Sequence, residues 1–217
     1  MIELPADEVH LWWADVDDTT DSPLAERCMQ LMAPEEKQQH DRFHFAKDRR
    51  RYLATRALVR SALARYAPVA PAAWAFSSSE FGRPIIRNLE AQAAGLHFNI
   101  SHTDRFVVLA LSRARELGVD TETIDREAPL NVASSYFSPA EIQALMQLPP
   151  HQQHLRFWEL WTFKESYIKA RGQGLSLPLD RFSILLPHEG MVRLEIDTAL
   201  GDTASLWQLW QLRPAPT

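Results

Sequence analysis

Short apolar runs separated by polar breaks mark the first part of the chain as a strand followed by helices. The run HLWWADV at 10–16 is rich in aromatic residues, which predicts a strand. A helix is expected over about 23–32. Pro34 and the two glutamates after it form a favourable first helical turn, and neither Gly nor Pro occurs from there to Tyr66. We therefore expect one long helix or a helix pair over 34–66.

Three later runs are short and apolar enough to be strands. They are GLHFNI at 95–100, RFVVLAL at 105–111 and ELGVDTETI at 116–124. Polar turn residues separate them, and two of the three make a plausible hairpin. The sequence therefore predicts that strands follow the long helical segment.

The second part of the chain repeats this order of elements. Ser138 is placed to be an N-cap, with Pro139 at the first helical position and Glu141 closing a capping box. A long aromatic helix is expected over about 155–171, ended by Gly172. Three alternating runs, RFSILL, VRLEI and SLWQLWQL, are then predicted strands, at 181–186, 192–196 and 205–212.

This repeated order predicts an α+β fold made of two similar halves. The halves are residues 1–110 and 111–217, and we expect them to pack about an approximate two-fold axis. The repeat lies in the order of elements and not in residue identity.

Composition and charge narrow the class of protein. A length of 217 residues with 46% hydrophobic residues is enough for a packed core. The formal net charge of −5 gives no general basic face for nucleic acid, so any anion site must be local. Cys28 is the single cysteine, which excludes an internal disulfide; we expect it to fill apolar space. No signal peptide and no run of 18 apolar residues is present, which predicts a cytoplasmic protein without a membrane segment.

Two carboxylates form the first candidate site. In a strand, Asp120 and Glu122 point to the same face about 7 Å apart. Paired carboxylates without a basic neighbour suit a hard cation such as Mg²⁺. A solvated strand face explains the same spacing, and the spacing alone does not decide between the two.

The second candidate lies on the long aromatic helix. Trp158, Trp161, Glu165 and Lys169 follow one another at steps of three or four residues and form one stripe. An exposed Glu–Lys pair is the simpler interpretation. The aromatic neighbours indicate burial, however, and a buried charge is costly unless it has a partner.

Four motifs, taken together and in order, closely resemble the Sfp-type 4′-phosphopantetheinyl transferases. They are FGRP at 81–84, FNISH at 98–102, GVDTE at 118–122 and WTFKESYIKARGQGLSLPL at 161–179. The resemblance runs from about residue 40 to residue 185, and the last motif is long enough to be highly specific. It implies a monomer whose two halves form an intramolecular pseudo-dimer.

The resemblance also implies a reaction and a set of roles. The enzyme would move the phosphopantetheine arm of coenzyme A to a serine of an apo acyl- or peptidyl-carrier protein and release 3′,5′-ADP. Asp120, Glu122 and Glu165 would hold Mg²⁺, and Glu165 would also take the proton of the carrier serine. Lys169 would stabilise the departing nucleotide. His102 would bind a phosphate of coenzyme A, with Ser101 beside it.

Two arginines complete the implied site. Arg51 aligns with the position that grips the 3′-phosphate of coenzyme A, although Arg49 or Arg50 could make this contact instead. Arg83 aligns with a basic residue beside the adenosine end and stands where lysine is more common. Thr121 replaces the usual aliphatic residue between the metal carboxylates. Neither replacement removes a group that the chemistry needs.

Two other classes of function remain to be separated from this one. A noncatalytic module that binds coenzyme A or a carrier protein would keep the fold without needing the full set of carboxylates and lysine. An unrelated magnesium phosphohydrolase is disfavoured because the sequence has no Gly-rich phosphate loop and only seven glycines. Release of 3′,5′-ADP only in the presence of an apo-carrier would distinguish all three.

Overall fold

A computed structural model describes residues 1–19, 23–188 and 190–213. Contacts between residues divide the chain into two compact units. The first comprises residues 1–122 and 165–174, and the second comprises residues 123–164 and 175–217. The predicted halves, residues 1–110 and 111–217, were defined by the order of elements along the chain and not by contacts. The division into these halves stays a prediction.

The first unit is built on a three-stranded antiparallel sheet with the order β1-β5-β4. The strands are β1 (Val9–Asp15), β4 (Leu96–His102) and β5 (Phe106–Arg113). Strands β4 and β5 are joined as the predicted hairpin, with Phe98 opposite Leu111 and His102 opposite Val107. A second, two-stranded sheet contains β2 (Phe76–Ser78) and β3 (Pro84–Ile86).

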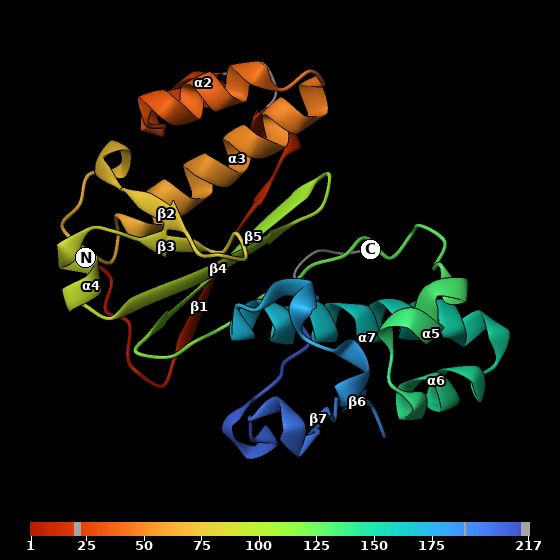
Figure 1. The fold of residues 1–217 in the computed structure, drawn as a ribbon. Helices are drawn as coiled ribbons and strands as arrows, with labels where there is room; N and C mark the ends of the chain where they lie inside the picture. Colours follow the sequence, from red (N-terminus) through yellow and green to blue (C-terminus); the bar gives the residue numbers. More distant parts are fainter. Residues whose placement is uncertain (20–22, 189, 214–217) are drawn as a thin grey trace. The chain divides into compact units, whose positions relative to one another are not determined.

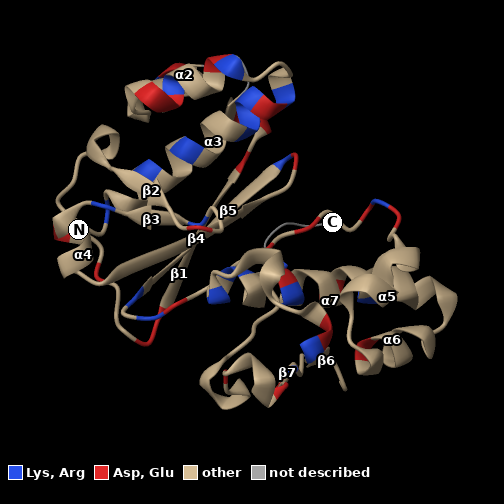
Figure 2. Ribbon diagram, viewed as in Figure 1, with Lys and Arg blue, Asp and Glu red and all other residues tan. Residues whose placement is uncertain are grey.

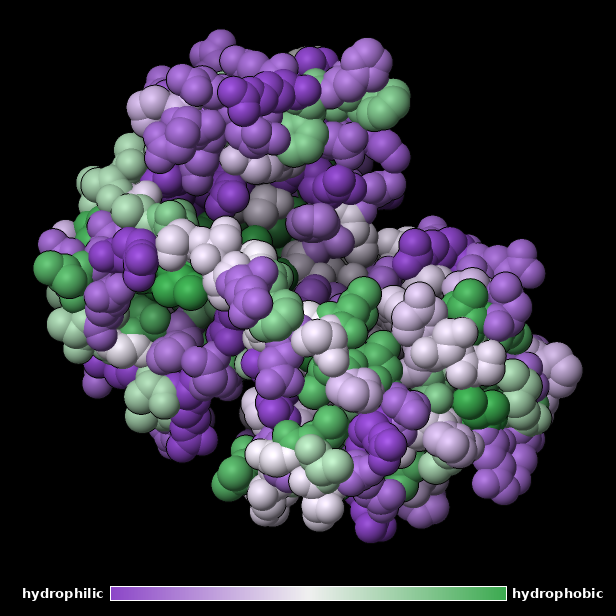
Figure 3. Space-filling model, viewed as in Figure 1, coloured by the Kyte–Doolittle hydropathy of each residue, from purple (hydrophilic) through white to green (hydrophobic). Residues whose placement is uncertain are grey.

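Helices of the first unit cover one face of the β1-β5-β4 sheet (Figure 1). The predicted helix pair is confirmed as α2 (Pro34–Arg42) and α3 (Ala46–Leu63), after α1 (Pro23–Leu31). Helix α3 lies against the sheet, and α2 lies outside α3 with a mostly hydrophilic outer surface (Figures 1 and 3). A short helix, α4 (Leu89–Ala93), precedes β4. The core between α3 and the sheet contains apolar residues of both, including Val59, Leu63, Phe98, Leu109 and Leu111.

Helix α3 carries most of the basic residues of this layer, as bands of Lys and Arg along its length (Figure 2). One of them is structural. The side chain of Arg60 is 1% exposed, and its Nε donates to Glu36 of α2 at 2.7 Å. Arg60 also donates to the carbonyl oxygens of Pro71 and Trp74. Because an unpaired buried guanidinium would be costly, the bond to Glu36 holds α2 against α3, and the other two hold the 71–74 segment there.

The second unit combines helices with a two-stranded sheet. Its helices are α5 (Ala133–Tyr136), α6 (Pro139–Met146) and the first part of α7 (Pro150–Arg171), and its strands are β6 (Phe182–Leu185) and β7 (Arg193–Ile196). The predicted capping box at the start of α6 is confirmed, with Ser138 and Glu141 exchanging hydrogen bonds. Glu141 is fully buried and also accepts from Lys164 Nζ at 2.7 Å and from the backbone of Ile184 at 2.6 Å. Burial lowers the pKa of Lys164, and the charge of Glu141 opposes this shift.

The α+β class is confirmed, and two strand predictions are wrong. Residues 116–123 form an irregular connection that pairs with no strand, and the backbone N–H of Val119 bonds the side chain of Asn99 instead of a neighbouring strand. Residues 205–212 alternate in polarity, yet they form a 3₁₀ turn, Ala204–Leu206, followed by irregular backbone. The expected apolar role of Cys28 is confirmed, since it is buried against Met32 and Leu53.

No helix in the described part of the chain is long and apolar enough to cross a membrane.

Candidate active site

Three of the predicted site residues meet at one point in the first unit. Lys169 Nζ lies 2.5 Å from Asp120 Oδ1 and donates to Ser101 Oγ at 2.9 Å. The hydroxyl of Ser101 in turn donates to the same Asp120 oxygen at 2.8 Å. Strand β4, the 116–122 connection and helix α7 therefore each contribute one member of a closed polar triangle.

Strand β4 places its polar residues by alternation. Asn99 and Ser101 lie on one face, and Phe98 and Ile100 face the core beneath α3. Asn99 is 4% exposed, and its Oδ1 accepts from the backbone N–H of Val119 at 3.0 Å. Asn99 therefore holds the backbone next to Asp120 while Ser101 holds the side chain. The role of Asn99 was not predicted; a buried amide in the middle of an apolar strand was the available signal.

The 116–122 connection approaches α7 too closely for any residue but glycine at 118. A Cβ atom built on Gly118 would fall on the carbonyl oxygen of Ser166 and lie 2.5 Å from the amide nitrogen of Ala170. Both atoms belong to the backbone of α7 and cannot move aside as a side chain could. The close approach at Gly118 brings Asp120 within reach of Lys169.

The carboxylates of the site act on one another. Burial raises the pKa of Glu165, the negative charges of Asp120 and Glu122 raise it further, and Lys169 opposes the shift. The three predicted metal carboxylates are therefore close enough to interact, with one lysine among them. A group with a raised pKa holds a proton more readily, which is what a general base requires.

These carboxylates suit Mg²⁺ in chemistry, although they do not form a complete cage. Asp120 Oδ2 is buried and has no hydrogen-bond partner, so one oxygen of the site is available for a ligand. Among the described residues, no three His, Cys, Asp or Glu side chains converge as a ready metal cluster. Mg²⁺ characteristically takes one or two carboxylates and completes its shell with water and substrate phosphate, so an incomplete protein shell fits this ion.

His102 lies at the end of β4, where the positive charges of the site gather. The residue is exposed at this strand end, and its pKa is lowered by partial desolvation of the ring and by the charges of Arg51 and Lys169, which Asp120 opposes. Because successive side chains of a strand point to opposite faces, His102 points away from Ser101 and toward the same face as Phe98 and Ile100. The ring is therefore neutral near pH 7 and offers an N–H group to an anion rather than a charge.

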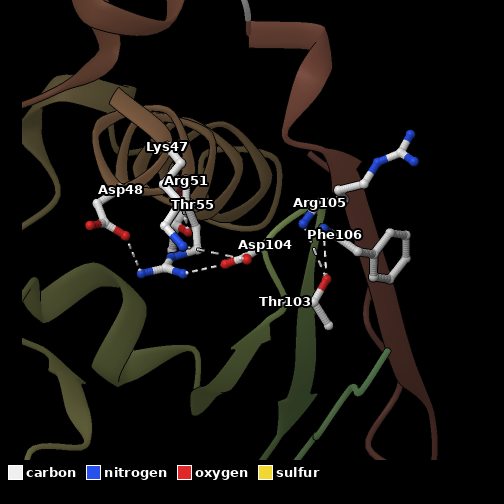
Figure 4. Close-up of polar contacts among 8 residues, drawn as sticks. All are labelled: Lys47, Asp48, Arg51, Thr55, Thr103, Asp104, Arg105 and Phe106. Carbon is white, nitrogen blue, oxygen red and sulfur yellow. Dashed lines mark hydrogen bonds and ion pairs between the residues drawn. The ribbon is translucent and has the colours of Figure 1, made fainter. Parts of the chain in front are cut away.

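Arg51 extends from α3 toward the turn between β4 and β5 (Figure 4). Its Nη2 bonds Asp48 Oδ1 and its Nη1 bonds Asp104 Oδ1, each at 2.9 Å. The neighbouring Arg49 donates to the carbonyl oxygen of Phe43 instead. Neither carboxylate partner of Arg51 was predicted from the sequence.

Two family models match almost the whole chain in tandem. The model described as "4′-phosphopantetheinyl transferase, N-terminal" matches residues 20–114, and the "4′-phosphopantetheinyl transferase superfamily" model matches residues 116–215. A 4′-phosphopantetheinyl transferase of Bacillus subtilis is 37% identical over 180 residues, which cover 81% of this chain and 78% of the relative. The chain belongs to the 4′-phosphopantetheinyl transferase superfamily. The resemblance of its four motifs to this family is thereby confirmed, and the protein is a phosphopantetheinyl transferase.

Further relatives extend over more of this transferase. The 4′-phosphopantetheinyl transferase HetI of Nostoc is 33% identical over 214 residues, covering 98% of this chain and 86% of the relative. A crystal structure of a holo-(acyl-carrier-protein) synthase from Bacillus anthracis, in complex with coenzyme A (3′,5′-ADP), matches with a TM-score of 0.40 at 14% identity. It covers 48% of this chain and 91% of that chain.

Arg83 of the transferase is occupied by contacts within the first unit. Its Nη1 lies 2.6 Å from Glu116 Oε2 and donates to the carbonyl oxygen of Ala170 at 3.3 Å. These contacts tie the β2–β3 turn to the 116–122 connection and to the end of α7. The predicted contact of Arg83 with adenosine stays a prediction, and the observed contacts give it a structural role as well.

Proposed function

We propose that this transferase moves the 4′-phosphopantetheine moiety of coenzyme A to a serine of an apo acyl- or peptidyl-carrier protein, with Mg²⁺, and releases 3′,5′-ADP. The observation that carries the proposal is the polar triangle of Ser101, Asp120 and Lys169, with the raised pKa of Glu165 beside it. A solvated strand face or an exposed Glu–Lys pair would not produce a buried, partnerless carboxylate oxygen at Asp120.

Each residue has a defined part in this transfer. Glu165 accepts the proton of the serine hydroxyl as the serine oxygen bonds to the β-phosphorus of coenzyme A. The bond from that phosphorus to the oxygen of 3′,5′-ADP breaks, and Lys169 offers its positive charge to the leaving phosphate. Bound Mg²⁺, held by Asp120, Glu122 and Glu165, would neutralise charge on the pyrophosphate. Ser101 keeps Asp120 and Lys169 in place through its two hydrogen bonds.

The nucleotide end of coenzyme A would be held by His102, Arg51 and Arg83. His102 presents a neutral ring beside two positive charges, so a phosphate bound there would be favoured by both. Arg51 is the α3 arginine whose charge reaches His102, which supports its choice over Arg49 and Arg50 for the 3′-phosphate. A guanidinium fork matches the geometry of phosphate oxygens.

We also propose a compartment, an oligomeric state and partners for the enzyme. It acts in the cytoplasm as a monomer, on a carrier protein and coenzyme A, without nucleic acid. These proposals follow from the single cysteine, the net charge of −5 and the tandem order of the two family models.

Mass spectrometry of carrier proteins tests the proposal. The protein is incubated with coenzyme A, Mg²⁺ and a panel of apo-carriers, and each carrier is then weighed. A gain of one phosphopantetheine with stoichiometric 3′,5′-ADP, dependent on both carrier and Mg²⁺, is expected. Binding of coenzyme A without any gain by any carrier would indicate a noncatalytic module, and 3′,5′-ADP release without a carrier would indicate a hydrolase.

A further inference from the structure

The guanidinium of Arg51 is held between two carboxylates that differ in exposure (Figure 4). Asp48 lies three residues earlier on α3, and its side chain is 22% exposed. Asp104 lies on the turn between β4 and β5, and its side chain is 65% exposed. The two aspartates therefore bind the same guanidinium from a sheltered and from a solvated position.

The turn that carries Asp104 is organised by another residue. Thr103 Oγ1 accepts from the backbone N–H groups of Arg105 and Phe106, at 3.3 and 3.0 Å. In Figure 4 these bonds lie on the strand side of the turn, and Asp104 extends from its other side to α3. Removing the Asp104 carboxylate would therefore leave the bonds that shape the turn in place.

Asp104 also lies near a second positive charge of α3. Lys47 Nζ is 3.8 Å from Asp104 Oδ2, and Lys47 and Arg51 are one helical turn apart. With Asp48 included, two positive and two negative charges meet at this point, and their formal charges cancel. A site proposed to bind a phosphate is thus neutralised by the chain itself.

A phosphate and Asp104 cannot both take the same face of Arg51 without repulsion. A phosphomonoester carries nearly two negative charges at pH 7 and bonds a guanidinium more strongly than one exposed carboxylate does. Exposed ion pairs are weak because water and salt screen them. The 3′-phosphate would therefore displace Asp104, while the less exposed Asp48 keeps its bond to Arg51.

We propose that Asp104 is an internal counter-ion that occupies Arg51 in the absence of coenzyme A and competes with its 3′-phosphate, and so limits the affinity for 3′-phosphorylated nucleotides. Asp48 is the positioning residue that orients the guanidinium in both states. This inference rests on the proposed role of Arg51 in binding coenzyme A. Asp104 and Asp48 therefore have opposite effects on nucleotide binding, although their bonds to the Arg51 guanidinium are equally short.

Calorimetric titration of purified variants tests this competition. The ligands are 3′,5′-ADP and 5′-AMP, which differ only in the 3′-phosphate. Asp104→Asn should bind 3′,5′-ADP about 2- to 5-fold more tightly than the parent, the range expected for loss of one exposed ion pair, with no change for 5′-AMP. The gain should shrink as salt is added. Asp48→Asn should bind 3′,5′-ADP no more tightly than the parent.

A charge-matched control separates local competition from the general loss of one negative charge. Glu90 is exposed on α4, and the whole of β4 separates it from the Asp104 turn. Glu90→Gln should leave both affinities unchanged. The gain of Asp104→Asn should also vanish in an Arg51→Ala background, because the competition acts through Arg51.

Equal or weaker binding of 3′,5′-ADP by Asp104→Asn overturns the inference, and so does an equal gain in Glu90→Gln or Asp48→Asn. The failure of the proposed function is distinguishable. If the parent transfers phosphopantetheine and Arg51→Ala removes its preference for the 3′-phosphate, an unchanged Asp104→Asn refutes the competition alone. If the parent modifies no carrier, the proposed function itself is wrong.

Discussion

At the scale of single residues, the two carboxylate oxygens of Asp120 have different environments. Oδ1 bonds Ser101 and Lys169, whereas Oδ2 is buried without a partner. A buried carboxylate oxygen with no hydrogen bond is costly, and a bound cation would remove that cost. Asp120 and Glu122 should therefore act through the same ion.

Titration of activity with Mg²⁺ tests this shared ion. Asp120→Ala and Glu122→Ala should each raise the Mg²⁺ concentration that gives half activity, by 10-fold or more if a ligand is lost. The double variant should be far from additive, because both changes act on one ion. If neither single variant shifts the Mg²⁺ requirement, these carboxylates are not ligands.

A pH prediction follows from His102. Partial desolvation and the charges of Arg51 and Lys169 hold its pKa below the usual 6.5 in the free protein, and bound phosphates would offset the two positive charges. Binding of 3′,5′-ADP should then raise this pKa and take up protons, so His102 should favour binding increasingly as the pH falls from about 7.5 toward 6. The difference in affinity between the parent and His102→Asn isolates this effect, because titration of the phosphates is common to both. Parallel pH profiles for the two proteins would contradict it.

At the scale of elements, the helices and the β4–β5 hairpin could be predicted because apolar spacing and capping residues specify them locally. The Ser138 box and the stop at Gly172, which has a φ of 65°, are of this kind. The connection carrying Asp120 was wrongly predicted as a strand, because its conformation depends on Asn99 and on α7, which are distant in sequence. The residue types of the site were evident, whereas the partners of Arg51 were not.

Gly118→Ala tests the close approach of this connection to α7. The added methyl group would collide with the α7 backbone, displace Asp120 and lower kcat/KM, by about 100-fold if the shift approaches 1 Å. Gly201→Ala is the matched control. Its φ is 62°, with nothing within 4 Å of a built Cβ, so it should cost about 1 kcal/mol of stability and no activity. Thermal unfolding of both variants separates stability from catalysis, and a fully active Gly118→Ala would show that the approach is unimportant.

At the scale of the whole molecule, two family models match the chain in tandem, over residues 20–114 and 116–215, and the repeat of element order stays a prediction. The predicted monomer would follow if one chain supplies both halves of the fold. Light scattering at several protein concentrations should give one species near 24.8 kDa. A mass near twice this value that persists on dilution would contradict the prediction.

We propose that the carboxylates around Lys169 catalyse the transfer of phosphopantetheine to a carrier serine. The most direct measurement is the rate at which an apo-carrier gains phosphopantetheine, followed by mass spectrometry with the parent and with Glu165→Gln. The amide keeps the size of the side chain and removes the proposed base and metal ligand, so the rate should fall by about 10²–10⁴ while the thermal unfolding profile stays that of the parent. A correctly folded Glu165→Gln that modifies the carrier within threefold of the parental rate would contradict the claim.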